Sequence, residues 1–148
     1  MNTDYPRYRI LLVDDENNNR MLIIRLLRGL NYDLHDVSNG EEAVKTWQSW
    51  KPHLILMDMR MPIMNGYVAT REIRKLEQEQ QSSHLDSTQS EPSFQTTKIL
   101  AITANAFEEE EVRIFEAGCD AIIHKPFRVD QLRQTIAQHL ESFSLEKN

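Results

Sequence analysis

Short apolar runs alternate with amphipathic stretches five times along this chain of 148 residues. The runs are bounded by polar positions and predict buried strands. They cover residues 9–13, 33–37, 54–58, 98–103 and 121–124. After each run, apolar residues recur at intervals of three or four, which predicts a helix. The helices are expected at 17–30, between a cap at Ser38 or Asn39 and Pro52, and at 66–80, 107–117 and 129–143.

This alternation is typical of an α/β domain with a parallel sheet, helices on both faces and right-handed crossovers. One stretch breaks the rhythm. Residues 80–97 are rich in Gln, Ser and Thr, contain Pro92, and include only Leu85 and Phe94 as apolar residues. We therefore expect a mobile polar surface insertion, over residues 81–97, between the third helix and the fourth strand.

Five chemically active residues stand where the predicted strands end. Asp14 and Asp15 follow the first strand, Asp58 ends the third, Thr103 ends the fourth, and Lys125 follows the fifth. Ligands of open α/β sheets bind outside the carboxyl ends of the strands, so these residues are expected to meet. Clustered carboxylates repel one another and require a cation, for which a hard divalent metal and the lysine ammonium are the candidates.

The composition excludes several classes of protein. The hydrophobic fraction of 40% and charged fraction of 27% suit one soluble globular domain. No apolar stretch approaches the roughly 18 residues that span a bilayer. The net charge of -6 argues against direct nucleic-acid binding, and the single Cys119 excludes an internal disulfide and favours a cytoplasmic location. The five histidines show no metal-ligand spacing and are interpreted as structural or exposed.

Four segments, the last of which contains the lysine-proline pair after the fifth strand, give the chain a specific resemblance. They are the segments Leu-Val-Asp-Asp-Glu at 12–16, Met-Asp-Met-Arg-Met-Pro-Ile-Met-Asn-Gly at 57–66, Ala-Ile-Thr-Ala at 101–104 and His-Lys-Pro-Phe at 124–127. In this order they resemble the receiver domain of two-component response regulators. The resemblance covers residues 8–143, with tails at 1–7 and 144–148, and implies a flavodoxin-like doubly wound (βα)5 fold with strand order 2-1-3-4-5.

The resemblance assigns roles position by position. Asp58 matches the phosphoacceptor, and a carboxylate can indeed attack a phosphoryl group. Asp15, with help from Asp14, matches the Mg²⁺ ligands, which also include Asp58 and the backbone carbonyl of Arg60. An octahedral Mg²⁺ that keeps several waters needs no more than this from the protein.

Two further roles concern the phosphoryl group itself. Lys125 matches the lysine that pairs with the phosphoryl oxygens, and the family has a cis bond before the proline that follows, here Pro126. Thr103 matches the hydroxyl that binds the phosphoryl group on activation. Pro62 and Gly66 are expected to shape the loop after Asp58, Gly66 through its backbone freedom.

One position departs from the family. Three residues before the lysine the family has Tyr or Phe coupled to the threonine, whereas this chain has Ile122. Signal relay through an aromatic side chain is therefore in question. The phosphorylation chemistry does not depend on that side chain.

The resemblance implies a phosphorelay receiver that takes a phosphoryl group from phosphohistidine with Mg²⁺ and then changes conformation. Its partner would be a histidine kinase or histidine phosphotransfer domain, without nucleic acid or membrane contact, and a dimer would form through the fourth helix, fifth strand and fifth helix. The domain would catalyse only its own phosphorylation and hydrolysis. An enzyme of the haloacid dehalogenase type would need a second Asp where Arg60 stands, and a flavodoxin would need a phosphate loop in place of residues 16–19.

The motif variants at 57–74 and 101–107 resemble those of hybrid sensor histidine kinases. The chain also shows no DNA-binding extension after Phe143. We therefore expect a segment of such a kinase, whose full-length protein would be a protein-histidine kinase and could be membrane-anchored. A single-domain response regulator, which shares all the chemistry, is the alternative.

Overall fold

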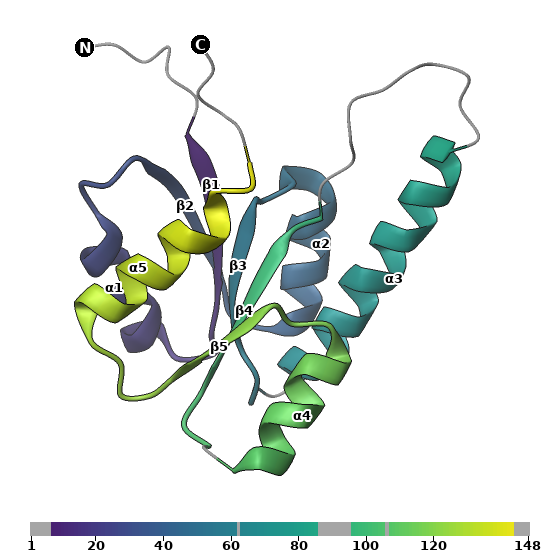
Figure 1. Cartoon of the computed structure of the whole chain (residues 1–148). Coiled ribbons are helices and arrows are strands. Elements are labelled where there is room, and N and C mark those ends of the chain that lie inside the picture. The colour runs from purple at the N-terminus through teal and green to yellow at the C-terminus, as the bar shows by residue number, and fades with distance from the viewer. Residues whose placement is uncertain (1–6, 62, 86–95, 106, 144–148) are drawn as a thin grey trace.

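The computed structural model describes residues 7–61, 63–85, 96–105 and 107–143, with the backbone alone for 83–85. The chain forms a five-stranded parallel sheet in the order β2-β1-β3-β4-β5, as expected (Figure 1). The strands are β1 (Tyr8–Val13), β2 (Tyr32–Val37), β3 (Leu54–Asp58), β4 (Lys98–Thr103) and β5 (Ala121–His124). The helices are α1 (Asn17–Leu27), α2 (Gly40–Trp50), α3 (Gly66–Leu85), α4 (Glu108–Ala117) and α5 (Val129–Leu140).

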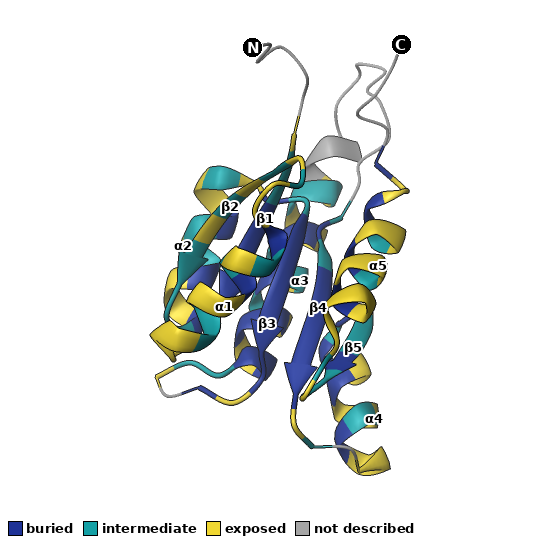
Figure 2. Ribbon diagram, turned by 90° about the vertical axis from the view of Figure 1, so that its left-hand side faces the viewer, coloured by how far each residue is buried: buried dark blue, intermediate teal, exposed yellow. Residues whose placement is uncertain are grey.

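Alternate residues of the central strands face two separate cores. In β3, Ile55 and Met57 pack with α2, α3 and α4, while Leu54 and Leu56 pack with α1 and α5. Because both faces are covered, all five residues of β3 are buried, and the central strands β3 and β4 are dark blue in Figure 2. The edge strand β2 has no buried residue. The continuous apolar runs of the sequence thus reflect the central strands, which are covered on both faces.

Three predicted helix boundaries are wrong. Helix α1 ends at Leu27 rather than residue 30, because Gly29 takes a positive φ of 90° and turns the chain out of the helix. Helix α5 ends at Leu140, although Phe143 is still buried against the core. Helix α3 continues past residue 80 to Leu85, since nothing in the polar sequence 81–85 breaks a helix.

The expected insertion therefore needs correction at its two ends. Its first five residues belong to α3, and Thr97 at its far end is buried rather than exposed. Residues 86–95 lie outside the described part of the chain, as do the two tails 1–6 and 144–148 and Pro62, whose expected effect on the loop stays a prediction.

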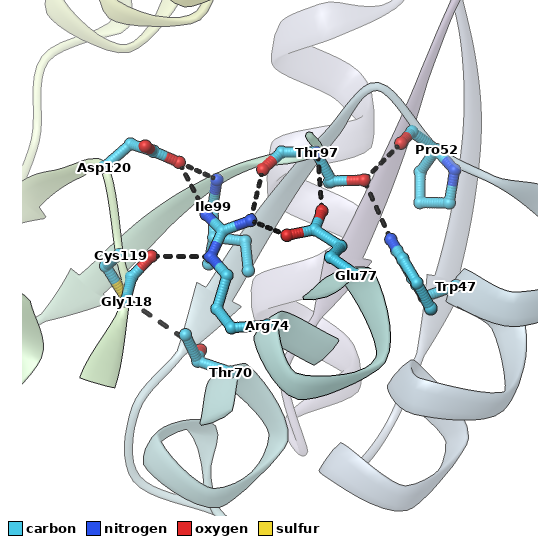
Figure 3. Close-up of polar contacts among 10 residues, drawn as sticks. All are labelled: Trp47, Pro52, Thr70, Arg74, Glu77, Thr97, Ile99, Gly118, Cys119 and Asp120. Carbon is cyan, nitrogen blue, oxygen red and sulfur yellow. Dashed lines mark hydrogen bonds and ion pairs between the residues drawn. The ribbon is translucent and has the colours of Figure 1, made fainter. Parts of the chain in front are cut away.

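A polar network closes the base of this segment (Figure 3). Glu77 on α3 accepts the backbone N–H of Thr97 at 2.8 Å, and Arg74 donates to the Glu77 carboxylate at 2.7 Å and to the Thr97 carbonyl at 2.8 Å. Arg74 also reaches Asp120, whose carboxylate accepts the N–H of Ile99. These bonds fix where β4 begins relative to α3, whatever path the chain takes between them.

The hydroxyl of Thr97 extends the network to α2. It accepts a hydrogen bond from Trp47 Nε1 at 2.8 Å and donates to the carbonyl of Pro52 at 3.0 Å, in the buried interior. The indole N–H of a buried tryptophan requires such a partner. Thr97 therefore ties α2, the entry to β3 and the entry to β4 together.

Candidate functional site

Three carboxylates meet at the carboxyl ends of β1 and β3. Asp14 and Asp15 follow β1, Asp58 ends β3, and the two strands are direct neighbours in the sheet. One oxygen from each carboxylate lies within 4.8 Å of the others. Asp14 and Asp58 are buried and Asp15 is exposed, so the cluster opens to solvent on one side. The prediction that these residues lie together is confirmed, and their oxygens are the ligand type that Mg²⁺ prefers.

Gly66 brings α3 up to the end of β3. A Cβ atom at Gly66 would stand 2.5 Å from the carbonyl oxygen of Asp58 and 2.7 Å from the Cα of Met59. Its N–H bonds to the Met59 carbonyl, and its φ is not positive. The special backbone angle predicted for Gly66 is wrong: the glycine is needed because two backbones approach closely.

The electrostatics of Asp58 follow from its surroundings. Burial is the largest effect and raises the pKa of Asp58 from 3.8 to about 6. The N–H of Arg60 donates to Asp58 Oδ1 at 3.2 Å and lowers the pKa of Asp58. The negative charge of Asp14 raises this pKa, the positive charge of Lys125 lowers it, and Asp15 raises it again. The lysine thus compensates only part of the negative charge, and the cluster favours a further cation.

Lys125 and Thr103 approach the cluster from β5 and β4. The N–H of Lys125 donates to the Thr103 carbonyl at 2.9 Å, and the Lys125–Pro126 bond is cis, as the resemblance implied. Thr103 is buried, and its hydroxyl accepts the N–H of Asn105 at 3.1 Å. A cavity of about 410 Å³ beside the cluster has Asp14 and Lys125 in its wall, so all five predicted residues lie at one end of the sheet.

The same end of the sheet carries exposed apolar side chains. Leu22 on α1, Ile63 in the loop after β3 and Phe107 before α4 are all exposed. The cavity wall is also largely apolar, with Leu22, Ile23 and Phe127 among its residues. Exposed apolar groups around a polar centre are typical of a protein-binding surface.

The first turn of α4 makes contacts that the sequence analysis missed. Glu110 is buried and accepts a hydrogen bond from the Tyr67 hydroxyl on α3, and Arg113 stacks over the Tyr67 ring. Glu111 Oε2 lies 3.1 Å from Nε2 of His124 at the end of β5. The first turn of α4 contains four consecutive glutamates, Glu108 to Glu111, and no sequence signal identifies which of the four face inward.

Ile122 occupies the position where the family has an aromatic residue. It is half-buried and packs against the core shared by α2, α3 and α4. His124, two residues later, is therefore the β5 side chain that makes a polar contact with α4. No spacing in the sequence predicts this contact of His124.

Comparisons with known proteins agree with this geometry. Residues 10–137 match the family model of the response regulator receiver domain. The sensor histidine kinase RcsC of Salmonella typhi is 33% identical over 132 residues, which are 89% of this chain and 12% of that protein. RcsC of Escherichia coli K12 is 31% identical over 94% of this chain and 13% of its own length. The chain thus spans about an eighth of these curated relatives.

Two solved structures are similar in both sequence and fold. The receiver domain of the sensor histidine kinase PA1611 from Pseudomonas aeruginosa PAO1, with magnesium coordinated in its active site cleft, is 31% identical with a TM-score of 0.74, over 92% of this chain and 99% of that one. The receiver domain of Saccharomyces cerevisiae Ssk1, in complex with the histidine phosphotransfer protein Ypd1, is 25% identical with a TM-score of 0.82, over 95% and 94% of the two chains.

Proposed function

Because this chain belongs to the response regulator receiver domain family, we propose that it accepts a phosphoryl group from phosphohistidine onto Asp58. The observation that carries the proposal is the Asp58 carboxylate at the end of the central strand, within 4.8 Å of the carboxylates of Asp14 and Asp15. In the transfer, an Asp58 oxygen attacks phosphorus as the bond to the imidazole nitrogen breaks. The nitrogen keeps the electron pair, and an aspartyl phosphate forms.

The residues fit a divalent cation. Asp15, Asp58, Asp14 and the carbonyl of Arg60 would hold Mg²⁺, because three carboxylates with oxygens within 4.8 Å of one another supply the ligand type that this cation prefers. When bound, the metal supplies charge neutralisation for the phosphoryl oxygens. Lys125 would pair with another of these oxygens, and the Thr103 hydroxyl would exchange its bond with Asn105 for one to the phosphoryl group.

The proposed donor is a histidine kinase or histidine phosphotransfer domain. Asp58 is only 7% exposed, so a donor imidazole must reach down past the rim to meet it. The exposed Leu22, Ile63 and Phe107, from three separate segments at this end of the sheet, offer apolar contacts to a docking protein. A surface of this kind suits a protein better than a small metabolite.

After phosphorylation, we propose that the face formed by α4, β5 and α5 shifts between two states. The pair Glu111–His124 and the bond between Tyr67 and Glu110 hold α4 on its two sides, and either can be broken and remade. Val112 and Phe115 lie exposed on α4 and could bury themselves in a dimer through this face.

We also propose that the chain is a receiver segment of a hybrid sensor histidine kinase on the cytoplasmic side of the membrane. Similarity to a short part of long sensor kinases supports this. In the described residues no helix has both the length and the hydropathy needed to cross a bilayer. The size of the native polypeptide separates this proposal from a single-domain regulator: a product far longer than 148 residues is expected, and one of that length would contradict it.

The test of the chemistry uses acetyl phosphate, a donor that needs no docking surface. With Mg²⁺ the wild type should gain the mass of one phosphoryl group, and Asp58→Asn should not. Asp33→Asn removes an exposed carboxylate in β2 and serves as the matched control that should still be labelled. Labelling of Asp58→Asn to the wild-type level would exclude Asp58 as the acceptor.

A further inference from the structure

Arg20 is a side chain beside the acidic cluster to which the family roles above assign nothing. It lies on α1, and its side chain is 14% exposed. Its Nη1 donates to the backbone carbonyl of Asp14 at 2.6 Å, and its Nε donates to the Asp36 carboxylate at 2.7 Å. Its Nη2 donates to Asn17 Oδ1 at 3.1 Å. One guanidinium therefore joins the end of β1, the edge strand β2 and the first turn of α1.

The bond from Arg20 is one of three hydrogen bonds that hold Asp14 in place. The Asp14 N–H donates to the Val37 carbonyl at 3.2 Å, and Asp14 Oδ1 accepts the N–H of Glu16 at 2.9 Å. With Arg20 on the carbonyl, the backbone of Asp14 is held on both sides. The next peptide carries Asp15, so its orientation is held as well.

The placement of Arg20 is unfavourable for α1 taken alone. The start of a helix favours negative charge, yet α1 has no acidic residue in its first turn and Glu16 makes no capping hydrogen bond. An arginine within about one turn of that end adds positive charge where the helix dipole disfavours it. A residue that is unfavourable for its own helix is expected to stabilise another part of the structure. The shortest hydrogen bond of the Arg20 side chain is to the loop of Asp14 and Asp15, so this loop is the part that it stabilises.

We propose that Arg20 is a positioning residue for the divalent cation: it holds the loop of Asp14 and Asp15 in the geometry that binds Mg²⁺. The inference rests on the proposed function, because it takes the acidic cluster as the metal site. Outer residues that orient metal ligands typically change metal affinity by about 10–100-fold when they are removed.

Electrostatics and positioning predict opposite results for Arg20→Met. The substitution removes a positive charge close to the carboxylates, which by Coulomb's law should tighten cation binding. Loss of positioning should weaken it instead. The direction of the change therefore separates the two effects, independently of its size.

The experiment titrates the intact chain with Mg²⁺ alone by calorimetry. We expect Arg20→Met to raise the dissociation constant about ten-fold. The matched control is Arg133→Met, because Arg133 donates to the Leu26 carbonyl at the other end of α1 with bonds of 3.0 and 2.8 Å. Arg133→Met should lower the urea midpoint through the same kind of lost bond while leaving the Mg²⁺ affinity unchanged.

Arg20→Lys keeps the charge but not the planar guanidinium, so it should also weaken Mg²⁺ binding. If Arg20→Met does not fold, Arg20→Lys is the variant that tests the inference. Unchanged or tighter Mg²⁺ binding in the variant tested would overturn this inference and leave the proposed function standing. A wild type that does not bind Mg²⁺ would overturn the metal role in the proposed function, and this inference with it.

Discussion

The hydroxyl of Thr97 should be among the most important single polar atoms for stability. Thr97→Val keeps the shape of the side chain but removes both of its hydrogen bonds, from Trp47 Nε1 at 2.8 Å and to the Pro52 carbonyl at 3.0 Å. Trp47 is 2% exposed and Thr97 is 7% exposed, so water cannot readily replace the lost partner. A buried polar group left without a partner costs about 1–3 kcal/mol.

Two groups lose their partner, so the free energy of unfolding should fall by about 2–6 kcal/mol. This is a large share of the total of about 5–15 kcal/mol that is typical of a domain. The assay is urea unfolding followed by tryptophan fluorescence, since Trp47 and Trp50 both lie on α2. The midpoint should move to lower urea, and the slope of the transition should not change.

The matched control is Thr135→Val on α5, whose hydroxyl donates to the Gln131 carbonyl, 2.8 Å away, in an exposed setting. Its effect should stay within about 0.5 kcal/mol. A double-mutant cycle with Trp47→Phe, followed by circular dichroism, should give a coupling energy of at least about 1 kcal/mol. Additive effects, or a Thr97→Val variant as stable as the control, would refute the reasoning.

Three further predictions concern the site. Because burial raises the pKa of Asp58 to about 6, above the unfolded value of 3.8, this group favours folding at low pH and loses that contribution as the pH rises through about 6. In EDTA, Asp58→Asn should therefore gain about 2 kcal/mol over wild type between pH 4 and pH 7, and a pH-independent difference would contradict this. Ile63 has a φ of 69°, so Ile63→Asn should raise the urea-derived stability by about 1 kcal/mol, whereas a loss would show that no strain is stored there. Beryllofluoride should change amide exchange on α4 only modestly in wild type and more in Ile122→Tyr; full-sized changes in wild type with no gain in the variant would make the missing ring irrelevant.

The sheet and the acidic cluster could be predicted because each depends on a local pattern. Buried parallel strands must be apolar on both faces, so the run 54–57 and the carboxylate of Asp58 that ends it are visible in the sequence itself. The strand order, which the resemblance to the receiver family implied, then brings Asp14 and Asp58 together, since β1 and β3 are neighbours.

The contacts that were missed depend on which neighbour a polar side chain meets. Glu77 and Glu110 are almost fully buried, yet in sequence they resemble the solvated glutamates beside them. Their burial follows from Thr97 and Tyr67, which lie far away along the chain. The role of Arg20 could not be predicted for the same reason, because β1 and β2 bring its partners Asp14 and Asp36 to it.

The most direct test of the account is phosphotransfer from a protein phosphohistidine. Radiolabelled histidine phosphotransfer protein is mixed with the chain in Mg²⁺, and label is followed on both proteins. We predict that label leaves the donor and appears on the wild type as an acid-stable, base-labile adduct, and that Asp58→Asn and EDTA each abolish the transfer. Label on Asp58→Asn at the wild-type level, or undiminished transfer in EDTA, would contradict the central claim.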